Sequence, residues 1–469
     1  MRRRLRAAVA LLLVVAALTA CGSPETGPCG ADAVGPITFA TVKNLTADQR
    51  TELKRRWQAG HPEEPLDIVV LPATSDEQRA QLGATLRVGQ RGGAGRRDGY
   101  DVVGLDVVFL AEFARSSLLF ELPEKRFNPA GFLDAPWDNS FYEKRLYAVP
   151  FTTNVGLLYY WADRLVDLGV IPNVQTRWTP ADWQEVRNAA LDSQDGAEAG
   201  PAGYTGQLAA YEGLTANALE LIWAEHGDLP TAGVETDPAL LDGAERGVGF
   251  LLDGVRNRWI DESALGFDEE DSLNAFARRR ALILRHWPDA WPALAASKHP
   301  VGVTRLPGKE SAVLGGESVA VARCSPYRES AQRFIEFLSA GEQQKWIFQT
   351  GLYLPAVKRL YTDGTSLVGP GGLTNEFVDL LYESVNQARG RPADPAWNRT
   401  SRTVQTVLHD ALERSAKETV YADDVVNDLA RELRSGSTVA VPPRSAGRRP
   451  TGPGRPAGPA VAARHRSGR

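Results

Sequence analysis

The sequence predicts an α/β fold with at least two domains or lobes. A chain of 469 residues is too long for a single hydrophobic core. Its 43% hydrophobic and 24% charged residues are typical of a globular protein. Short β-branched runs alternate with amphipathic helical patterns over residues 36–106. This alternation indicates a parallel sheet with helices on both faces.

The N-terminus has the pattern of an export signal. Four Arg precede an apolar run that ends at Leu18, and small residues then precede Cys21. A Cys at this place predicts a bacterial lipoprotein, in which Cys21 is acylated; an ordinary secretory signal with a chance Cys is the alternative. No segment approaches the roughly 20 apolar residues of a spanning helix. We therefore expect an extracytoplasmic protein that a lipid anchors to the cell membrane.

Strand and helix signals begin after a Gly- and Pro-rich tether. The glycine cluster at 91–99 follows a helix, so it lacks the context of a dinucleotide-binding fingerprint and is expected to be a loop. In the N-terminal part, strands are predicted at 36–42, 66–71 and 100–106, and helices at 46–59 and from Ser75, as its cap.

Beyond Phe151 the pattern becomes mainly helical. Thr179 is expected to cap a helix with Pro180 at its first position. Beyond Ser435, the Pro, Gly, Arg and Ala composition predicts disorder. Further helices are predicted at 205–226, 238–257 and 268–282, from Ser325, and around 404–411 and 425–433, and strands at 281–284, 301–307 and 318–322 around a Gly-rich turn.

The charge distribution argues against a nucleic-acid partner. Because residues 1–20 hold four Arg and residues 436–469 hold seven Arg and no acid, the formal charge of −5 for the whole chain conceals a charge of −16 for residues 21–435. Phosphate binding requires clustered Lys and Arg. Besides Cys21, only Cys29 and Cys324 remain, and they either form a disulfide or stay as two thiols.

Several stretches, in this order, resemble extracellular solute-binding proteins, the sugar-binding lipoproteins of ABC-type importers, similar to trehalose- and maltose-binding members. The resemblance covers roughly residues 36–433; Trp161-Ala stands where an Arg-Lys pair is common, and the Arg-rich tail is atypical. The stretches are Tyr100-Asp-Val-Val-Gly-Leu-Asp106, Arg145-Leu-Tyr-Ala-Val-Pro-Phe-Thr-Thr-Asn154, Thr176-Arg-Trp-Thr-Pro-Ala-Asp-Trp, Tyr211-Glu-Gly-Leu, Trp287-Pro, Gly315-Gly-Glu-Ser and Tyr353-Leu-Pro-Ala.

This resemblance implies a two-lobed, type II periplasmic-binding-protein-like fold with a ligand cleft between the lobes. It implies a sugar ligand, the permease subunits of an ABC importer as partners, and chain crossings near Val149-Pro150, Arg305–Pro307 and Tyr353–Pro355 that act as hinges. We expect a monomer. The expected segments are a signal peptide (1–20), a lipidated tether (21–35), lobe 1 (36–149 and 307–354), lobe 2 (150–306 and 355–435) and a disordered tail (436–469).

A sugar site needs aromatic rings for stacking and carboxylates or amides for hydrogen bonds. Asp106 ends a predicted parallel strand, where clefts of α/β sheets form; the alternative role is a helix cap. Trp287 lies between His286 and Pro288 and is expected to stack on a sugar ring, with core packing as its alternative and Trp291 as substitute. The other candidates, each equally compatible with a turn or helix start, are Asn154, Tyr211, Glu212, Gly316 and Glu317, with Lys43 and Asn44 as lesser ones.

Catalysis finds little support in the sequence. A glycosidase needs two carboxylates at a defined separation, and nothing pairs Asp106 with Glu212. The serine-hydrolase motif G-x-S-x-G is missing, the six His are scattered, and the acidic run 268–271 is expected to be a solvated helix start. No catalytic residue, cofactor or metal is therefore expected. The alternatives are a non-sugar solute such as a polyamine, a sensor role, or a secreted glycosidase; a disaccharide or short oligosaccharide such as trehalose or maltose is favoured.

Overall fold

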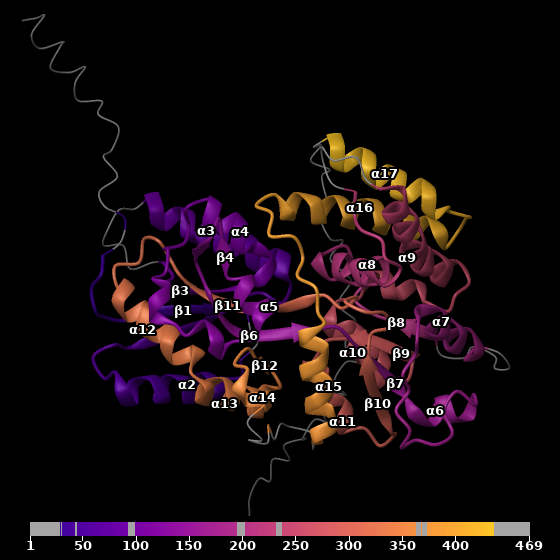
Figure 1. The fold of residues 1–469 in the computed structure, drawn as a ribbon, viewed down its shortest axis with the longest axis horizontal. Helices are drawn as coiled ribbons and strands as arrows, with labels where there is room; N and C mark the ends of the chain where they lie inside the picture. Colours follow the sequence, from indigo (N-terminus) through magenta and orange to yellow (C-terminus); the bar gives the residue numbers. More distant parts are fainter. Residues whose placement is uncertain are drawn as a thin grey trace, which may run out of the picture.

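The protein consists of two α/β lobes that lie side by side (Figure 1). The computed structural model describes residues 29, 31–42, 45–91, 99–194, 202–230, 237–362, 367 and 373–435. Cys21, Lys43, Asn44, the predicted signal, residues 92–98 of the predicted glycine-cluster loop and the predicted tail fall outside these residues. None of the helices in the described part is both long and apolar enough to cross a membrane.

Lobe I is built around a six-stranded mixed sheet. Its strands are parallel where β1 pairs with β2 and β3, and antiparallel where β11 pairs with β3 and β6. The sheet order is β12 (Leu354–Pro355), β6 (Val149–Val155), β11 (Leu314–Val321), β3 (Val102–Asp106), β1 (Ile37–Thr41) and β2 (Leu66–Val70). Its helices are α2 (Ala47–Gly60), α3 (Ser75–Arg91), α4 (Leu110–Arg115), α5 (Asp134–Asp138), α12 (Arg328–Ser339), α13 (Gly341–Gly351) and α14 (Arg359–Thr362), and a small hairpin joins β4 (Phe141–Tyr142) to β5 (Arg145–Leu146).

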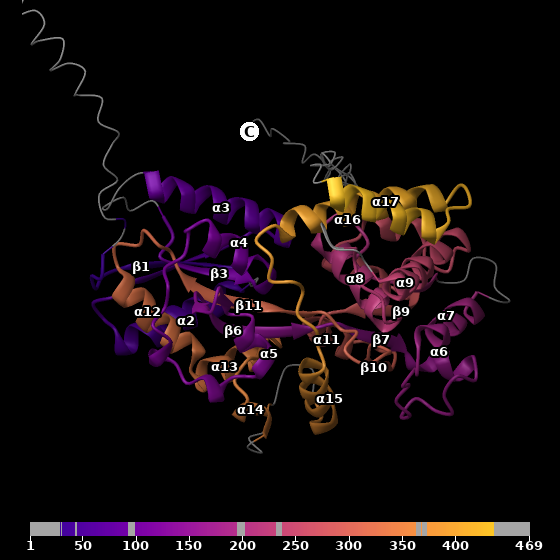
Figure 2. The same cartoon turned by 45° about the horizontal axis from the view of Figure 1, so that its top comes forward.

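Lobe II is built around a four-stranded sheet. Its long helix α8 is buried on all sides, because α9 and α16 pack against it and α17 covers α9 (Figure 2). The sheet order is β10 (Val301–Arg305), β7 (Leu157–Trp161), β9 (Ala281–His286) and β8 (Ala202–Thr205). The helices of this half are α6 (Ala162–Asp167), α7 (Trp183–Asp192), α8 (Glu212–Ala224), α9 (Pro238–Arg256), α10 (Glu269–Ala277), α11 (Trp291–Ala295), α16 (Trp397–Ser415) and α17 (Ala422–Ser435). Helix α15 (Asn375–Asn386) comes before the last crossing of the chain and contacts both β6 of lobe I and β10 of lobe II.

Three segments carry the chain between the two sheets. The first passes at Gly156, between β6 and β7; the second is 306–313, between β10 and β11; the third is 387–396, between α15 and α16. We call these segments crossings one, two and three. The second and third run together, since Val313 and Arg389 form a β-bridge. All three segments lie beside the interface of the lobes, and they therefore help to position the residues at this interface.

Two predicted crossings were misplaced. Val149 and Pro150 pair with β11 in the six-stranded sheet, so the chain leaves lobe I only at Gly156. Leu354 and Pro355 also belong to that sheet, as β12, and the third crossing follows α15 instead. A proline is typical of the end of a strand. Pro150 and Pro355 belong to strands instead, because an irregular or edge strand tolerates a residue without a backbone N–H.

Most predicted elements of lobe I are confirmed. Strands β1, β2 and β3 lie where alternation placed them. Helix α2 begins after Thr46, whose hydroxyl accepts a hydrogen bond from the Gln49 backbone N–H at 3.2 Å, while the Gln49 side chain accepts one from the Thr46 N–H at 2.8 Å. This reciprocal capping box is worth about 1 kcal/mol. Leu53 and Trp57 form the buried face of α2, as their spacing predicts.

Several predicted helix starts and one turn were wrong. Ser75 is the first helical residue of α3 rather than its cap, and its hydroxyl donates to Asp106. Helix α7 is capped by Asp182, not by Thr179, because the Asp182 carboxylate accepts from the Glu185 N–H at 3.0 Å. The predicted Gly-rich turn contains Gly315 and Gly316, which lie inside β11. The all-buried strands β7 and β8 were missed, since they show no alternation.

The two cysteines left open by the sequence are joined. Cys29 and Cys324 form a disulfide with their Cα atoms 4.6 Å apart. Next to it, the Ala31 N–H donates to the Ser325 carbonyl at 3.1 Å and the Arg328 N–H donates to the Ala31 carbonyl at 3.0 Å. The N-terminal end of the described chain is therefore held on lobe I both covalently and by backbone hydrogen bonds.

Candidate functional site

A cavity of about 390 Å³ lies between the two lobes. Both lobes contribute to its walls: the loops after β1, β2 and β3, and residues of β6 and β11, belong to lobe I, and the N-termini of α8 and α10 and the segment after β9 belong to lobe II. The lining side chains with polar or aromatic groups are Ser75, Gln78, Asp106, Asn154, Glu212, Asp268, Glu269, Glu270, Trp287, Asp289, Tyr353 and Arg391.

Trp287 supplies an aromatic surface on the lobe II side. It follows β9 directly, and Pro288 begins a short 3₁₀ turn after it, so the Trp287 backbone is extended. The Tyr159 hydroxyl donates to the Trp287 carbonyl at 3.1 Å, and the indole Nε1 donates to Glu269 at 3.4 Å. Tyr353 supplies a second ring from the segment before β12, and burial raises the pKa of its hydroxyl. The cavity thus has aromatic groups from both lobes.

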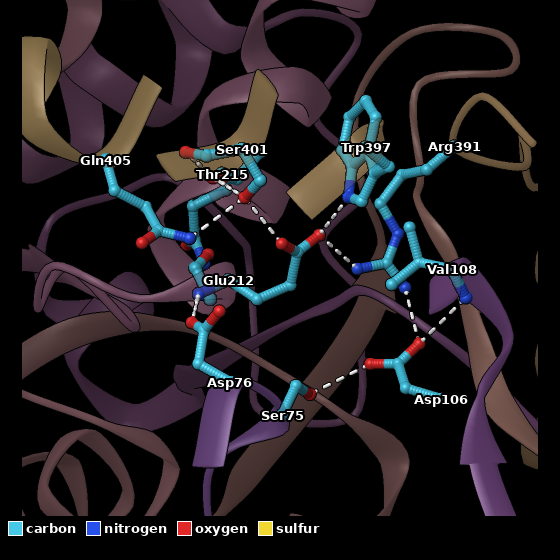
Figure 3. A network of polar contacts seen from close by, with 12 residues as sticks. Ser75, Asp76, Asp106, Val108, Glu212, Thr215, Arg391, Trp397, Ser401 and Gln405 are labelled. Atoms are coloured by element: carbon cyan, nitrogen blue, oxygen red, sulfur yellow. Dashed lines mark hydrogen bonds and ion pairs between the residues drawn. The ribbon is translucent and has the colours of Figure 1, made fainter. Parts of the chain in front are cut away.

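Arg391 joins two of the predicted site carboxylates (Figure 3). It lies on crossing three, and its guanidinium donates to Glu212 at 2.7 Å and to Asp106 at 3.0 Å. Asp106 also accepts from the Ser75 hydroxyl at 2.8 Å and caps the short turn after β3 through the Val108 N–H at 3.3 Å. Asp106 therefore serves as the alternative helix cap and lines the cavity at the same time.

Glu212 is the most deeply buried carboxylate of the cavity, with 3% of its surface exposed. Besides Arg391, it accepts from the Trp397 indole N–H at 3.0 Å and from the Ser401 hydroxyl at 2.5 Å. Burial raises its pKa to about 7, and Arg391 opposes this shift. Its backbone N–H donates to Asp76 of α3 at 2.9 Å, so a carboxylate of lobe I also contacts the first turn of α8 in lobe II.

Acidic residues at the start of α10 line the cavity together with Trp287. Asp268 caps this helix, since it accepts from the Asp271 N–H at 3.1 Å. Glu269 accepts from the Tyr211 hydroxyl at 2.7 Å, and burial raises the pKa of Glu269. The helix start expected for the acidic run is confirmed, but Asp268, Glu269 and Glu270 also line the cavity, so the run is not simply solvated. Asp289 adds a fourth carboxylate to the cavity lining.

The structure separates the predicted site residues into two groups. Asp106, Asn154, Glu212, Trp287 and Gly316 line the cavity, where Asn154 pairs with Gly315 across the β6–β11 ladder.

Tyr211 and Glu317 are absent from the cavity lining. The Tyr211 ring is buried behind Glu269, to which its hydroxyl donates. Glu317 of β11 lies over Gly104 of β3 and accepts from the Thr41 hydroxyl of β1 at 3.0 Å. A strand sends alternate side chains to opposite faces, so the neighbour of a lining glycine points away from the cavity.

Four important lining residues were missed. Arg391 lies on an irregular segment with no motif, and only its Arg-Gly-Arg-Pro surroundings mark it as unusual. Tyr353 was part of a stretch that resembles the family, but was not chosen as a site residue. Glu269 and Asp289 could have been found from their closeness in sequence to a helix start and to Trp287. In the described part of the chain, no group of three or more His, Cys, Asp or Glu is arranged to hold a metal ion.

Comparison with known proteins identifies the family. The family model of bacterial extracellular solute-binding proteins matches residues 65–366. A probable ABC transporter-binding protein of Deinococcus radiodurans is 27% identical over 305 residues, which span 61% of this chain and 69% of that protein.

Solved structures share the fold. Maltose-bound MalE3 of T. maritima is 26% identical with a TM-score of 0.71, over 86% of this chain and 100% of that chain. A solute-binding protein of an ABC transporter from Thermotoga lettingae, bound with α-D-tagatose, is 19% identical with a TM-score of 0.70, over 86% and 99%. UgpB of Mycobacterium tuberculosis, in complex with glycerophosphocholine, is 17% identical with a TM-score of 0.69, over 86% and 98%.

These likenesses confirm the two-lobed, type II fold that the sequence resemblance implied. The family is one of extracytoplasmic binding proteins and not of enzymes, in agreement with the absence of a catalytic motif from the sequence. With its cavity between two lobes and a match over most of its length, the chain belongs to the bacterial extracellular solute-binding protein family.

Proposed function

We propose that this protein captures a sugar outside the cytoplasm and delivers it to the permease of an ABC importer. The observation that carries the proposal is the cavity between the lobes, which combines the rings of Trp287 and Tyr353 with the amides of Asn154 and Gln78 and several carboxylates. Apolar ring faces and convergent hydrogen-bonding groups are what a pyranose requires. The similarity to maltose-bound MalE3 supports the same conclusion.

The size of the cavity favours a small saccharide. Its volume of about 390 Å³ lies near the lower end of the range of ligand pockets, which is about 300–1,000 Å³. A disaccharide or short oligosaccharide such as maltose or trehalose is therefore the proposed ligand. Because both lobes line the cavity, a bound sugar would contact both walls and favour the closed arrangement. We propose Gly156, 306–313 and 387–396 as the hinge segments, in place of the boundaries expected from the sequence.

Titration calorimetry with maltose and trehalose tests this function. We expect binding without release of product, and we expect Trp287→Ala to weaken it by about 1–3 kcal/mol through loss of a stacked ring. Trp291→Ala is the matched control, because Trp291 packs against Phe377 and is not one of the cavity residues. Equal affinities of the Trp287→Ala variant and the unaltered protein would remove this ring from the site.

A cationic solute such as a polyamine is the second candidate. Four carboxylates that line the cavity with Trp287, namely Asp268, Glu269, Glu270 and Asp289, favour it. The same calorimetric experiment with spermidine distinguishes the two candidates. Binding of spermidine together with no response to either sugar would replace the first candidate by the second.

We also propose that a lipid on Cys21 anchors the protein. The support is the sequence pattern around Cys21 alone, since the residue lies outside the described part of the chain. Cys21→Ser should move the protein from the membrane fraction to the soluble fraction of cells and leave sugar affinity unchanged. A Cys21→Ser variant that still sediments with membranes would contradict the anchor.

A further inference from the structure

We infer that the buried Arg285–Glu220 pair is the positioning unit of the sugar site, which fixes the plane of the Trp287 ring and connects this ring to two of the crossings between the lobes. The inference rests on the proposed function, because it takes Trp287 as the ring on which the sugar stacks. Neither Arg285 nor Glu220 is among the residues that line the cavity. Both act through Trp287, and they are therefore positioning residues.

Every hydrogen-bonding nitrogen of the Arg285 guanidinium has a partner. Its Nε donates to Glu220 at 2.6 Å, one terminal nitrogen donates to Glu220 at 2.5 Å, and the other donates to Gln207 at 3.0 Å. The side chains of Arg285 and Glu220 are 0% and 1% exposed. Such a bidentate, fully buried pair holds the guanidinium plane in a single orientation.

The guanidinium lies over the Trp287 ring. The Arg285 Cζ is 3.9 Å from the ring centroid, so one face of the indole is covered and a sugar can stack only on the opposite face. The ring edge is held by Glu269, and the Trp287 carbonyl by Tyr159. Trp287 is thus oriented by protein groups before any ligand arrives, and a ring that is already oriented loses less conformational entropy when it binds.

The same pair contacts crossings one and two. Glu220 accepts from the backbone N–H of Val313 at 3.1 Å, and Val313 belongs to crossing two. At crossing one, a Cβ on Gly156 would lie 2.3 Å from a carboxylate oxygen of Glu220 and 2.7 Å from a guanidinium nitrogen of Arg285. Only glycine lets the chain pass the pair at this distance. The Arg285–Glu220 pair therefore links the orientation of the Trp287 ring to crossings one and two, which we propose as hinge segments.

Stability alone does not explain a charged pair at this place. A buried ion pair loses so much hydration that apolar side chains of similar volume often serve the fold as well. Other arginines of the described chain also lie over tryptophans, and one of them is Arg279, at 4.6 Å from the Trp161 centroid. Its partner is Asp163, and these two side chains are 27% and 31% exposed. That pair is at the edge of lobe II and away from the cavity lining, so it offers a control of the same chemistry.

A double-mutant cycle tests the inference, with maltose and trehalose as probes in titration calorimetry. Glu220→Gln/Arg285→Met removes both charges together and avoids an unpaired buried charge. We expect about tenfold weaker binding when Trp287 is present. In the Trp287→Ala background the same change should weaken binding less than about twofold, because the ring that it positions is gone. An equal factor in both backgrounds would overturn the inference.

Arg285→Lys provides an independent variant if the double variant does not fold. It keeps the charge for Glu220 but lacks the planar group that covers the indole. We expect a similar loss of affinity, again dependent on Trp287, together with a change in the tryptophan fluorescence response to sugar. Full affinity in Arg285→Lys would overturn the inference.

Asp163→Asn/Arg279→Met is the control for the cycle and should bind sugar as the unaltered protein does. A loss of affinity in this control would show that removing any such pair weakens binding, and would overturn the inference. If the unaltered protein binds neither sugar, the proposed function fails and the inference fails with it. If it binds, and Trp287→Ala weakens binding while the cycle is additive, only the inference fails.

Discussion

The two buried arginine–glutamate pairs beside the cavity differ in what they connect. Arg285 and Glu220 come from β9 and α8, and both belong to lobe II. Arg391 comes from crossing three and bonds to Asp106 of lobe I and to Glu212 of lobe II. The first pair lies within one rigid unit, whereas the second spans the interface between two units.

This difference separates the two roles that buried charge has in the protein. If the lobes open as proposed, we expect the distance between Arg285 and Glu220 to stay unchanged, because both residues belong to lobe II. We expect Asp106 to move away from Glu212, so that Arg391 keeps only one of its two partners. A bond within a lobe thus orients a binding group, and a bond between the lobes biases the equilibrium between open and closed arrangements.

Removing the cation inside lobe II should have the largest effect on stability. Arg285→Met leaves the Glu220 carboxylate buried and without its guanidinium, and we expect the free energy of unfolding to fall by about 3–5 kcal/mol. Glu220→Gln/Arg285→Met should recover most of this loss, since no charge is then left unpaired. Urea denaturation of both variants measures the difference. Equal instability of the single and double variants would show that packing of Arg285, and not its charge, is what lobe II requires.

Removing the cation between the lobes should cost less, about 2–3 kcal/mol. In Arg391→Met, Glu212 keeps its bonds from Trp397 and Ser401. Burial already raises the pKa of Glu212, and because Arg391 opposes this shift, its loss raises the pKa further and lets Glu212 take up a proton. We also expect the ligand-free variant to open, with a larger radius of gyration in small-angle X-ray scattering.

Arg389→Met is the control for this prediction. Arg389 is two residues away from Arg391, is 44% exposed and pairs with Asp228, so its loss should change stability by less than about 1 kcal/mol. An unchanged radius in Arg391→Met would argue against a role in closure.

The pH dependence of stability should report on Glu212 and give the smallest effect. Burial raises the folded-state pKa of Glu212 to about 7 from an ordinary value of 4.5. Between these values the folded protein binds this proton more tightly than the unfolded chain, so stability decreases as the pH rises from about 5 to 7.5, by about 2 kcal/mol. Glu212→Gln should flatten the slope but not abolish it, because burial also raises the pKa of Asp76. Thermal melts across this range measure the slope; an equal slope in Glu212→Gln would assign it to other groups.

Local patterns were sufficient to predict the N-terminal elements of lobe I but not the way in which the lobes are joined. The alternation around β1, α2 and β2 is visible in the sequence because these elements have buried and exposed positions. Strand β6 is buried at almost every position and gives no such signal, so the first crossing was placed at its start instead of at its end.

The candidate site was accessible to sequence reasoning only in part. Asp106 and Trp287 follow strands, and the ends of strands can be predicted. The partner of Asp106 could not be, because Arg391 is 285 residues away in the chain. Glu212 was chosen as an acceptor for a sugar, yet the structure shows that Arg391, Trp397 and Ser401 already engage its carboxylate. Such pairings depend on tertiary placement, which no local pattern contains.

The disulfide between Cys29 and Cys324 also sets a length scale. Seven residues lie between Cys21 and Cys29, and an extended chain advances by about 3.3–3.6 Å per residue. A lipid on Cys21 would therefore hold the attachment point on lobe I within about 30 Å of the bilayer. At that distance the protein would meet a permease by diffusing laterally in the plane of the membrane. The disulfide between Cys29 and Cys324 would keep lobe I at this distance from the bilayer as long as it is not reduced.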